Sequence, residues 1–123
     1  MMYFEIDGHS ALKAALKEMC AELAEENVPA GKVFDSKLAL NELVINALRY
    51  GGGRAYVSAE MRKGEIRITV RSEIAYCPPE ESVCPDARAE HGRGLYLVDA
   101  LCTSRAYSEQ EGICIVLRIE SDK

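Results

Sequence analysis

The stretch ELVINALRYGG, from Glu42 to Gly52, decides how this chain folds. Apolar residues recur in it at helical spacing and a glycine run follows, so it predicts an amphipathic helix that ends at Gly51–Gly53, where glycine tolerates a left-handed backbone. Glu42 and Asn46 are four residues apart and therefore share one face of that helix. A carboxylate and a carboxamide at this spacing can offer oxygen ligands to a hard cation such as Mg2+. Taken alone, the pair also fits the solvated face of an ordinary helix.

Patterns on either side of this helix predict the remaining elements. Apolar residues with a period near 3.6 indicate helices, and strict alternation indicates strands with one buried face. We expect a strand over 2–6, a helix capped by Ser10 that stops before Pro29, a helix over 35–50, a hairpin of strands over 55–62 and 66–71 turning at Lys63-Gly64, a helix that begins after Gly94, and strands over 102–107 and 113–119. This order predicts an α/β (α+β) two-layer sandwich, with three helices on one face of a mixed, largely antiparallel sheet.

Size and composition narrow the class of protein. A length of 123 residues with 48% hydrophobic residues predicts a single domain over residues 1–123. The net charge of -5 argues against a nucleic-acid partner, which would need a basic face. No apolar stretch approaches the length of a membrane span, and the start MMYFEIDGHS lacks the pattern of a signal peptide. We therefore expect a cytoplasmic protein that binds neither nucleic acid nor membrane.

The five cysteines are odd in number and not closely paired, which fits reduced thiols. Cys20, Cys102 and Cys114 fall in patterned segments and are expected to be small core residues. Cys77 and Cys84, with His91 beyond them, are conceivable metal ligands, but their spacing matches no zinc signature. They lie in or beside a stretch without periodicity, about 72–90, whose length suggests a lid over a site or a disordered segment.

A second motif, HGRGLYLVDAL, runs from His91 to Leu101. Glycines just before a helix allow backbone N–H groups to approach an anion, and the N-terminus of the helix adds partial positive charge. Arg93 could add charge-assisted hydrogen bonds to a phosphate, although exposed arginines are common. Two glycines of this kind also start helices for steric reasons alone.

Taken together, the two motifs and the elements between them resemble the Bergerat-fold ATP-binding domains, and most closely the anti-sigma-factor serine/threonine kinases of bacterial partner-switching systems. In that family an N-box Glu-x-x-x-Asn-Ala helix holds Mg2+, and a glycine-rich box cradles the phosphates. Glu42, Asn46 and Ala47 match the first motif, while Gly92, Gly94 and Leu95 match the second. The resemblance spans almost the whole chain.

The resemblance implies a role for each matching residue. Asn46 would ligate Mg2+ between the phosphates of ATP, and Glu42 would be the general base that takes a proton from a serine or threonine hydroxyl of a bound protein. Arg49 and Tyr50 would lie near the phosphates, with Gly92, Arg93, Gly94 and Leu95 on their other side. The implied partners are an antagonist protein and a sigma factor, and the implied assembly is a homodimer.

One departure from the family pattern concerns the adenine pocket. Relatives carry Asp-x-Gly-x-Gly after the second hairpin strand, with the Asp accepting a hydrogen bond from adenine, whereas this chain has Ser72-Glu73-Ile74-Ala75-Tyr76. Ser72 could accept that hydrogen bond, Glu73 could be shifted into place, or Ile74 and Tyr76 could fill the pocket with side chains. The loss of such a base-reading contact is worth about 1–3 kcal/mol. Near the C-terminus, Gly112 matches the family, but Ile113 replaces a more usual lysine or threonine.

These observations leave two main hypotheses. The first is a Mg-ATP-dependent serine/threonine kinase that acts on an antagonist protein and regulates a sigma factor. The second is a non-catalytic module that binds partners on a degenerate Bergerat fold, with weak or no ATP binding. A third, the ATPase domain of a histidine kinase, would have to act in trans, because the chain has no helical hairpin with a phosphoacceptor histidine.

Overall fold

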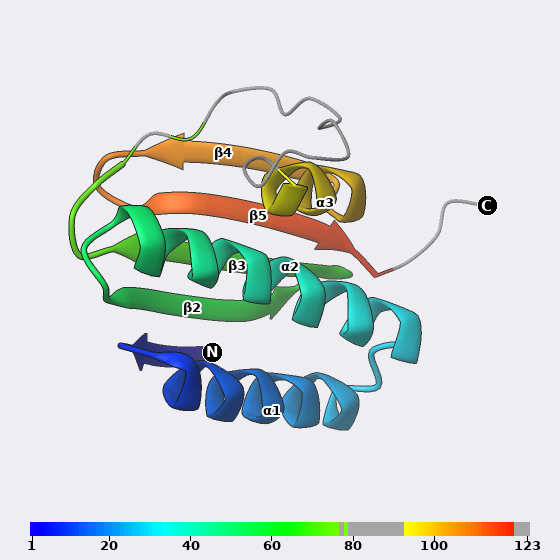
Figure 1. Cartoon of the computed structure of the whole chain (residues 1–123). Helices are drawn as coiled ribbons and strands as arrows, with labels where there is room; N and C mark the ends of the chain where they lie inside the picture. Colours follow the sequence, from blue (N-terminus) through cyan, green and yellow to red (C-terminus); the bar gives the residue numbers. More distant parts are fainter. Residues whose placement is uncertain (77, 79–92, 120–123) are drawn as a thin grey trace.

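A five-stranded sheet with helices on one face forms the structure (Figure 1). The computed structural model describes residues 1–76, 78 and 93–119. The order of the strands is β1-β2-β3-β5-β4, and every neighbouring pair is antiparallel. The elements, in chain order, are β1 (Met2–Ile6), α1 (His9–Glu25), α2 (Ala30–Tyr50), β2 (Ala55–Arg62), β3 (Glu65–Ser72), α3 (Arg93–Leu101), β4 (Ser104–Ser108) and β5 (Gly112–Arg118). The predicted two-layer α+β sandwich is confirmed, and all pairings among the described strands are antiparallel rather than mixed.

The core lies between the sheet and the helices. In β2 and β3, buried and more exposed residues alternate, as expected where one face of a sheet meets a core and the other meets water. Val57, Ile68 and Ile115 come from the three central strands and are fully buried, as are Leu40 and Leu43 of α2. Burial of such side chains contributes about 1.5–3 kcal/mol each before the entropy cost of folding. This packing holds α2 against the middle of the sheet.

Several predicted boundaries need correction. Ser10 is not a helix cap: α1 begins at His9, Gly8 occupies the cap position, and no side chain caps it. The second helix begins at Ala30 rather than at residue 35, because Pro29 occupies its cap position with an extended backbone that leads directly into the helix. The third helix begins at Arg93, so Gly94 lies inside its first turn.

Glycine supports two of the turns. The hairpin turns with φ of 39° at Lys63 and 78° at Gly64, the positive values that a two-residue primed turn requires. After α2, the left-handed conformation falls on Gly52 (φ 92°) and Gly53 (φ 88°), whereas Gly51 has φ -114°. The predicted glycine terminus is therefore correct, although the backbone of Gly51 itself does not require glycine.

Within the described residues, no helix is both long and apolar enough to cross a membrane. Cys20, Cys102 and Cys114 are free and partly buried, and Cys102 follows α3 rather than starting β4. The hypothetical metal ligands Cys77, Cys84 and His91 lie outside the described residues. Nowhere else in the described chain do three or more His, Cys, Asp or Glu side chains gather in a way that could hold a metal ion.

Candidate active site

The Glu42 carboxylate lies against the first turn of α3. A Cβ placed on Gly94 would approach Glu42 Oε1 to 2.5 Å and Glu42 Cδ to 3.4 Å. Only glycine leaves room for this contact, because a methyl group at that distance would overlap the carboxylate oxygen. The fold thus brings together the two sequence motifs, one from α2 and one from α3.

Asn46 lies one helical turn after Glu42 and is half-buried, like Glu42 itself. In the described part of the chain its carboxamide makes no hydrogen bond, so its oxygen is free to accept one or to bind a cation. The Glu42 carboxylate receives one long hydrogen bond, of 3.4 Å, from the side-chain amide of Asn41. The two polar side chains of α2 are therefore held by the helix rather than by a network of side-chain hydrogen bonds.

Ser72 ends β3 beside the C-terminus of α2. It is 9% exposed, and its hydroxyl donates a 2.6 Å hydrogen bond to the carbonyl of Ile74. A Cβ on Gly51 would collide with the Ser72 side chain, which explains why this position is glycine although its φ is ordinary. The Ile74 amide donates to the Gly51 carbonyl at 2.7 Å, which ties the segment after β3 to the end of α2.

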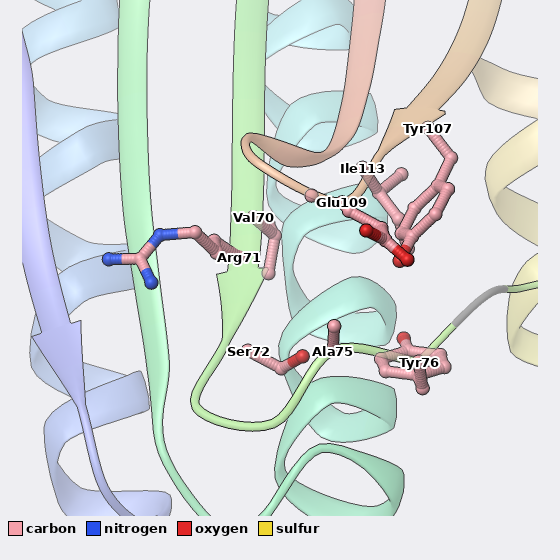
Figure 2. Close-up of a pocket in the computed structure, with 9 residues that line it drawn as sticks. Val70, Arg71, Ser72, Ala75, Tyr76, Tyr107, Glu109 and Ile113 are labelled. Atoms are coloured by element: carbon pink, nitrogen blue, oxygen red, sulfur yellow. The ribbon is translucent and has the colours of Figure 1, made fainter.

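Tyr76 lines a small cavity together with Ser72. Its ring packs against the core and lies 6.0 Å, centroid to centroid, from the ring of Tyr50. The cavity that Ser72, Tyr76 and Tyr107 help to line leaves only about 10 Å3 open to a water-sized sphere, roughly one water molecule (Figure 2). Ile74, in contrast, is 63% exposed. Of the two side chains considered for filling the adenine pocket, Tyr76 thus packs against the core and Ile74 is exposed.

The Tyr76 hydroxyl is buried and, among the described residues, has no hydrogen-bond partner. Burial raises the pKa of Tyr76 to about 12, with smaller contributions from Tyr50 and Tyr107. This phenol therefore stays neutral at physiological pH. Glu73 is not shifted toward the cavity, because it accepts a 2.6 Å hydrogen bond from the Tyr56 hydroxyl instead.

The chain matches the family model for the histidine kinase-like ATPase domain over residues 9–119, from the start of α1 to just beyond β5. It belongs to this family. No curated protein matches the chain. Family membership suggests that this histidine kinase-like ATPase domain binds ATP, typically with Mg2+, and it agrees with the observed sandwich of helices and sheet.

The remaining predicted site residues of this ATPase domain differ in their exposure to solvent. Arg49 and Tyr50 are exposed at the end of α2, where the Arg49 guanidinium lies 5.9 Å from the centre of the Tyr50 ring. The Leu95 side chain is buried, so only its backbone is available to a ligand. Gly92, the Arg93 side chain and most of the predicted lid, residues 77 and 79–90, lie outside the described part of the structure.

The residues of α2 and α3 fit the phosphates of a nucleotide, whereas the cavity near Ser72 does not fit its base. On α2, one turn after Glu42, Asn46 offers an amide oxygen without a hydrogen bond among the described residues, and Gly94 leaves the first turn of α3 without a side chain, so these residues fit Mg2+ and phosphate. At the other end of the candidate site, the cavity that Ser72 and Tyr76 help to line has room for about one water molecule and is too small for a purine.

Sequence reasoning missed three residues at this site. The contact between Gly51 and Ser72 could have been suspected from the glycine run, since three glycines exceed what a helix end needs. The hydrogen bond from Asn41 to Glu42 has no signal in the sequence, because adjacent helix positions point in different directions and the contact depends on the rotamers of both side chains. Tyr107 comes from β4, and no local signal places it near Tyr76.

Proposed function

We propose that this domain is a Mg-ATP-binding serine/threonine protein kinase of the anti-sigma-factor type, which phosphorylates an antagonist protein and regulates a sigma factor. The observation that carries the proposal is the contact of Glu42 on α2 with Gly94 on α3, with Asn46 one helical turn after Glu42 on the same face of α2. We further propose that the protein acts in the cytoplasm and as a homodimer, as the resemblance of its motifs to those kinases suggests.

In this proposal each residue has one task. Asn46 holds Mg2+ through its side-chain oxygen, and the first turn of α3 binds phosphate through backbone N–H groups. Bound Mg-ATP supplies the phosphoryl group and the counter-charge that its transfer requires. Glu42 orients a serine or threonine hydroxyl of the protein substrate and accepts its proton. Gly94 allows this carboxylate to stay beside the phosphate-binding turn, because no side chain stands between them.

The packing of Tyr76 favours a second candidate, a partner-binding regulator with weak or no ATP binding. The cavity that Tyr76 and Ser72 help to line has room for only about one water molecule, which is too small for a base. Such a protein would keep the fold and its partner surfaces without nucleotide chemistry. The two candidates differ in one measurable property, the affinity for Mg-ATP.

Isothermal titration calorimetry of Mg-ATP into the purified protein tests the proposal. For the kinase, we expect saturable binding in the micromolar range, about -8 kcal/mol, that weakens at least about tenfold in Asn46→Ala. Gln110→Ala is the matched control, since it removes a carboxamide from the exposed turn between β4 and β5. Glu42→Gln should keep the binding of Mg-ATP but lose phosphotransfer to a candidate antagonist.

The possible outcomes separate the two candidates. No heat of binding to a protein that is folded by circular dichroism would refute the kinase and support the regulator. Binding that appears only in Tyr76→Ala would show that the tyrosine closes an otherwise competent site. Equal losses in Asn46→Ala and Gln110→Ala would mean that the proposed cation ligand is wrong.

A further inference from the structure

A groove opens at the surface between α1 and α2, outside the candidate active site. Its volume is about 800 Å3, and Leu12, Leu16 and Cys20 of α1 form its apolar floor. The two helices lie side by side (Figure 1), connected by a short turn that reverses the chain. A groove between two such helices has the shape that a third helix fills in helix-in-groove recognition.

The rim of this groove is cationic in a chain whose net charge is -5. Lys13 and Lys17 line it from α1 and Lys37 lines it from α2, with His9 at one end, and no carboxylate is among its lining residues. All three lysines are exposed, and within the described residues none of them forms an ion pair.

The acidic residues of α1 lie outside the groove lining. Glu18, Glu22 and Glu25 follow one another at spacings of four and three, so they form a line of their own on a different side of the helix from His9, Lys13 and Lys17. Positive charge is thus concentrated where the groove opens. A partner that fits must combine apolar side chains for the floor with carboxylates for both rims.

We propose that the groove between α1 and α2 binds an acidic amphipathic helix of a partner protein. From His9 to Cys20 the groove runs about 16 Å along α1, the length of about three helical turns. Over that distance a docked helix would place apolar residues at i, i+4 and i+7 on the floor, and its glutamates or aspartates would face Lys13 and Lys17 on one side and Lys37 on the other. The lysines then serve mainly for selectivity and rate of association, since exposed ion pairs contribute little affinity each.

A membrane or a nucleic acid fits the same groove less well. Membrane-binding faces present large exposed apolar side chains, whereas Leu12 and Leu16 are 4% and 7% exposed and lie at the bottom of a concavity. Nucleic-acid sites combine broad positive charge with arginines and several stacking aromatics, whereas the groove lining has no arginine and His9 as its one aromatic ring. A helix is the occupant that matches both the concave shape and the paired cationic rims.

The groove ends next to the candidate active site. Asn41, which lines the groove, donates its amide hydrogen bond to the Glu42 carboxylate at 3.4 Å. A helix docked in the groove therefore lies within one side chain of the proposed general base. The docking proposal itself depends neither on ATP nor on phosphotransfer, and its test contains no nucleotide.

Fluorescence anisotropy with a defined peptide tests the proposal. The probe is a labelled helical peptide of about 14 residues, with leucine at i, i+3, i+4 and i+7 and glutamate on both flanks. Two comparison peptides have lysine in place of every glutamate, or the same composition in an order that breaks the apolar stripe. We expect saturable binding of the acidic amphipathic peptide, at least about tenfold tighter than either comparison peptide, and weaker at high salt.

Charge-reversal variants locate the binding. Lys13→Glu with Lys37→Glu changes one rim residue on each helix and should weaken the peptide at least about tenfold. Arg62→Glu with Lys63→Glu is the matched control: it makes the same change in net charge at the exposed hairpin turn and should alter affinity by no more than about twofold. Amide chemical shifts should change along α1 and α2 and not on the opposite face of the sheet.

Three outcomes would overturn the proposal. They are no saturable binding of the acidic peptide, equal binding of the lysine peptide, or equal affinity in the rim and hairpin variants. Co-sedimentation with vesicles of anionic phospholipid, without binding of the peptide, would assign the groove to a membrane instead. None of these results depends on whether the protein binds Mg-ATP.

Discussion

At Gly94, one added methyl group would change the candidate site. We expect Gly94→Ala to push the Glu42 carboxylate aside, because the new Cβ would lie 2.5 Å from Glu42 Oε1. The obstacle is the mobile end of a side chain, so the free energy of unfolding should change by no more than about 1 kcal/mol. Affinity for Mg-ATP should fall at least about tenfold, as measured by calorimetry.

Gly31→Ala is the matched control for this change. Gly31 lies in α2 with nothing within 4 Å of its added Cβ, so alanine there should stabilise the helix by up to about 1 kcal/mol and leave nucleotide affinity unchanged. If Gly94→Ala binds Mg-ATP as well as Gly31→Ala does, the contact with Glu42 has no part in ligand binding.

Removal of the Tyr76 hydroxyl tests whether this buried group contributes to stability. Because this group is buried without a hydrogen-bond partner among the described residues, Tyr76→Phe should leave stability unchanged or raise it by about 1 kcal/mol. Tyr3→Phe, at a position that is 65% exposed, is the control and should have no effect. Urea unfolding measures both changes. A clear loss of stability in Tyr76→Phe would mean that the hydroxyl is hydrogen-bonded after all.

At the scale of elements, a bidentate ion pair between Asp99 of α3 and Arg105 of β4 links these two elements. Arg105 Nε and Nη2 donate to the Asp99 carboxylate oxygens at 2.5 and 3.0 Å, and the Arg105 side chain is only 7% exposed. This attachment holds the helix whose first turn carries Gly94. It therefore supports the site from the far end of the same element.

Asp99→Asn should cost about 2 kcal/mol of unfolding free energy, because it removes the negative charge from the carboxylate that two guanidinium N–H groups of the mostly buried Arg105 contact. The partial exposure of Asp99, 27%, keeps the figure below that for a fully buried pair. Glu60→Gln breaks the more exposed pair with Arg62, whose N···O distance is 3.8 Å, and should cost less than about 0.5 kcal/mol. Comparable losses in the two variants would show that the Arg105 pair contributes no more than a surface contact.

For the molecule as a whole, alkaline pH should reduce stability. Burial raises the pKa values of the Cys20 and Cys102 thiols above 9.0 and that of Tyr76 from 10.0 to about 12. Because the folded state keeps these protons longer than the unfolded state, their contribution is complete below pH 9.0 and is lost as pH rises through the raised values.

Thermal unfolding under reducing conditions, from about pH 8 to about pH 11, measures this loss. The melting temperature should fall with rising pH, and the fall just above pH 9.0 should be shallower in Cys20→Ala with Cys102→Ala. An identical slope in wild type and variant would contradict the assignment of this loss to the thiols.

The sequence alone determines most helices and strands of this protein and its family. Local periodicity of apolar residues indicates which face of each element is buried. The strand at Met2–Ile6, the hairpin around Lys63-Gly64 and the helix that ends at Tyr50 follow from such patterns. The motifs around Glu42 and Gly94 likewise predict the family. The pattern predicts the start of α2 at residue 35 instead of Ala30, because the first turn of the helix, after Pro29, has little apolar periodicity of its own.

Other properties depend on contacts between residues far apart in the chain, and only the tertiary structure decides them. Sequence spacing does not reveal that Gly94 leaves room for Glu42, that Tyr76 rather than Ile74 packs against the core, or that lysines from α1 and α2 line one groove. Each depends on how helices and strands pack against each other. That packing is set by the shape of the whole core, so these features of the site could not be read from any single segment.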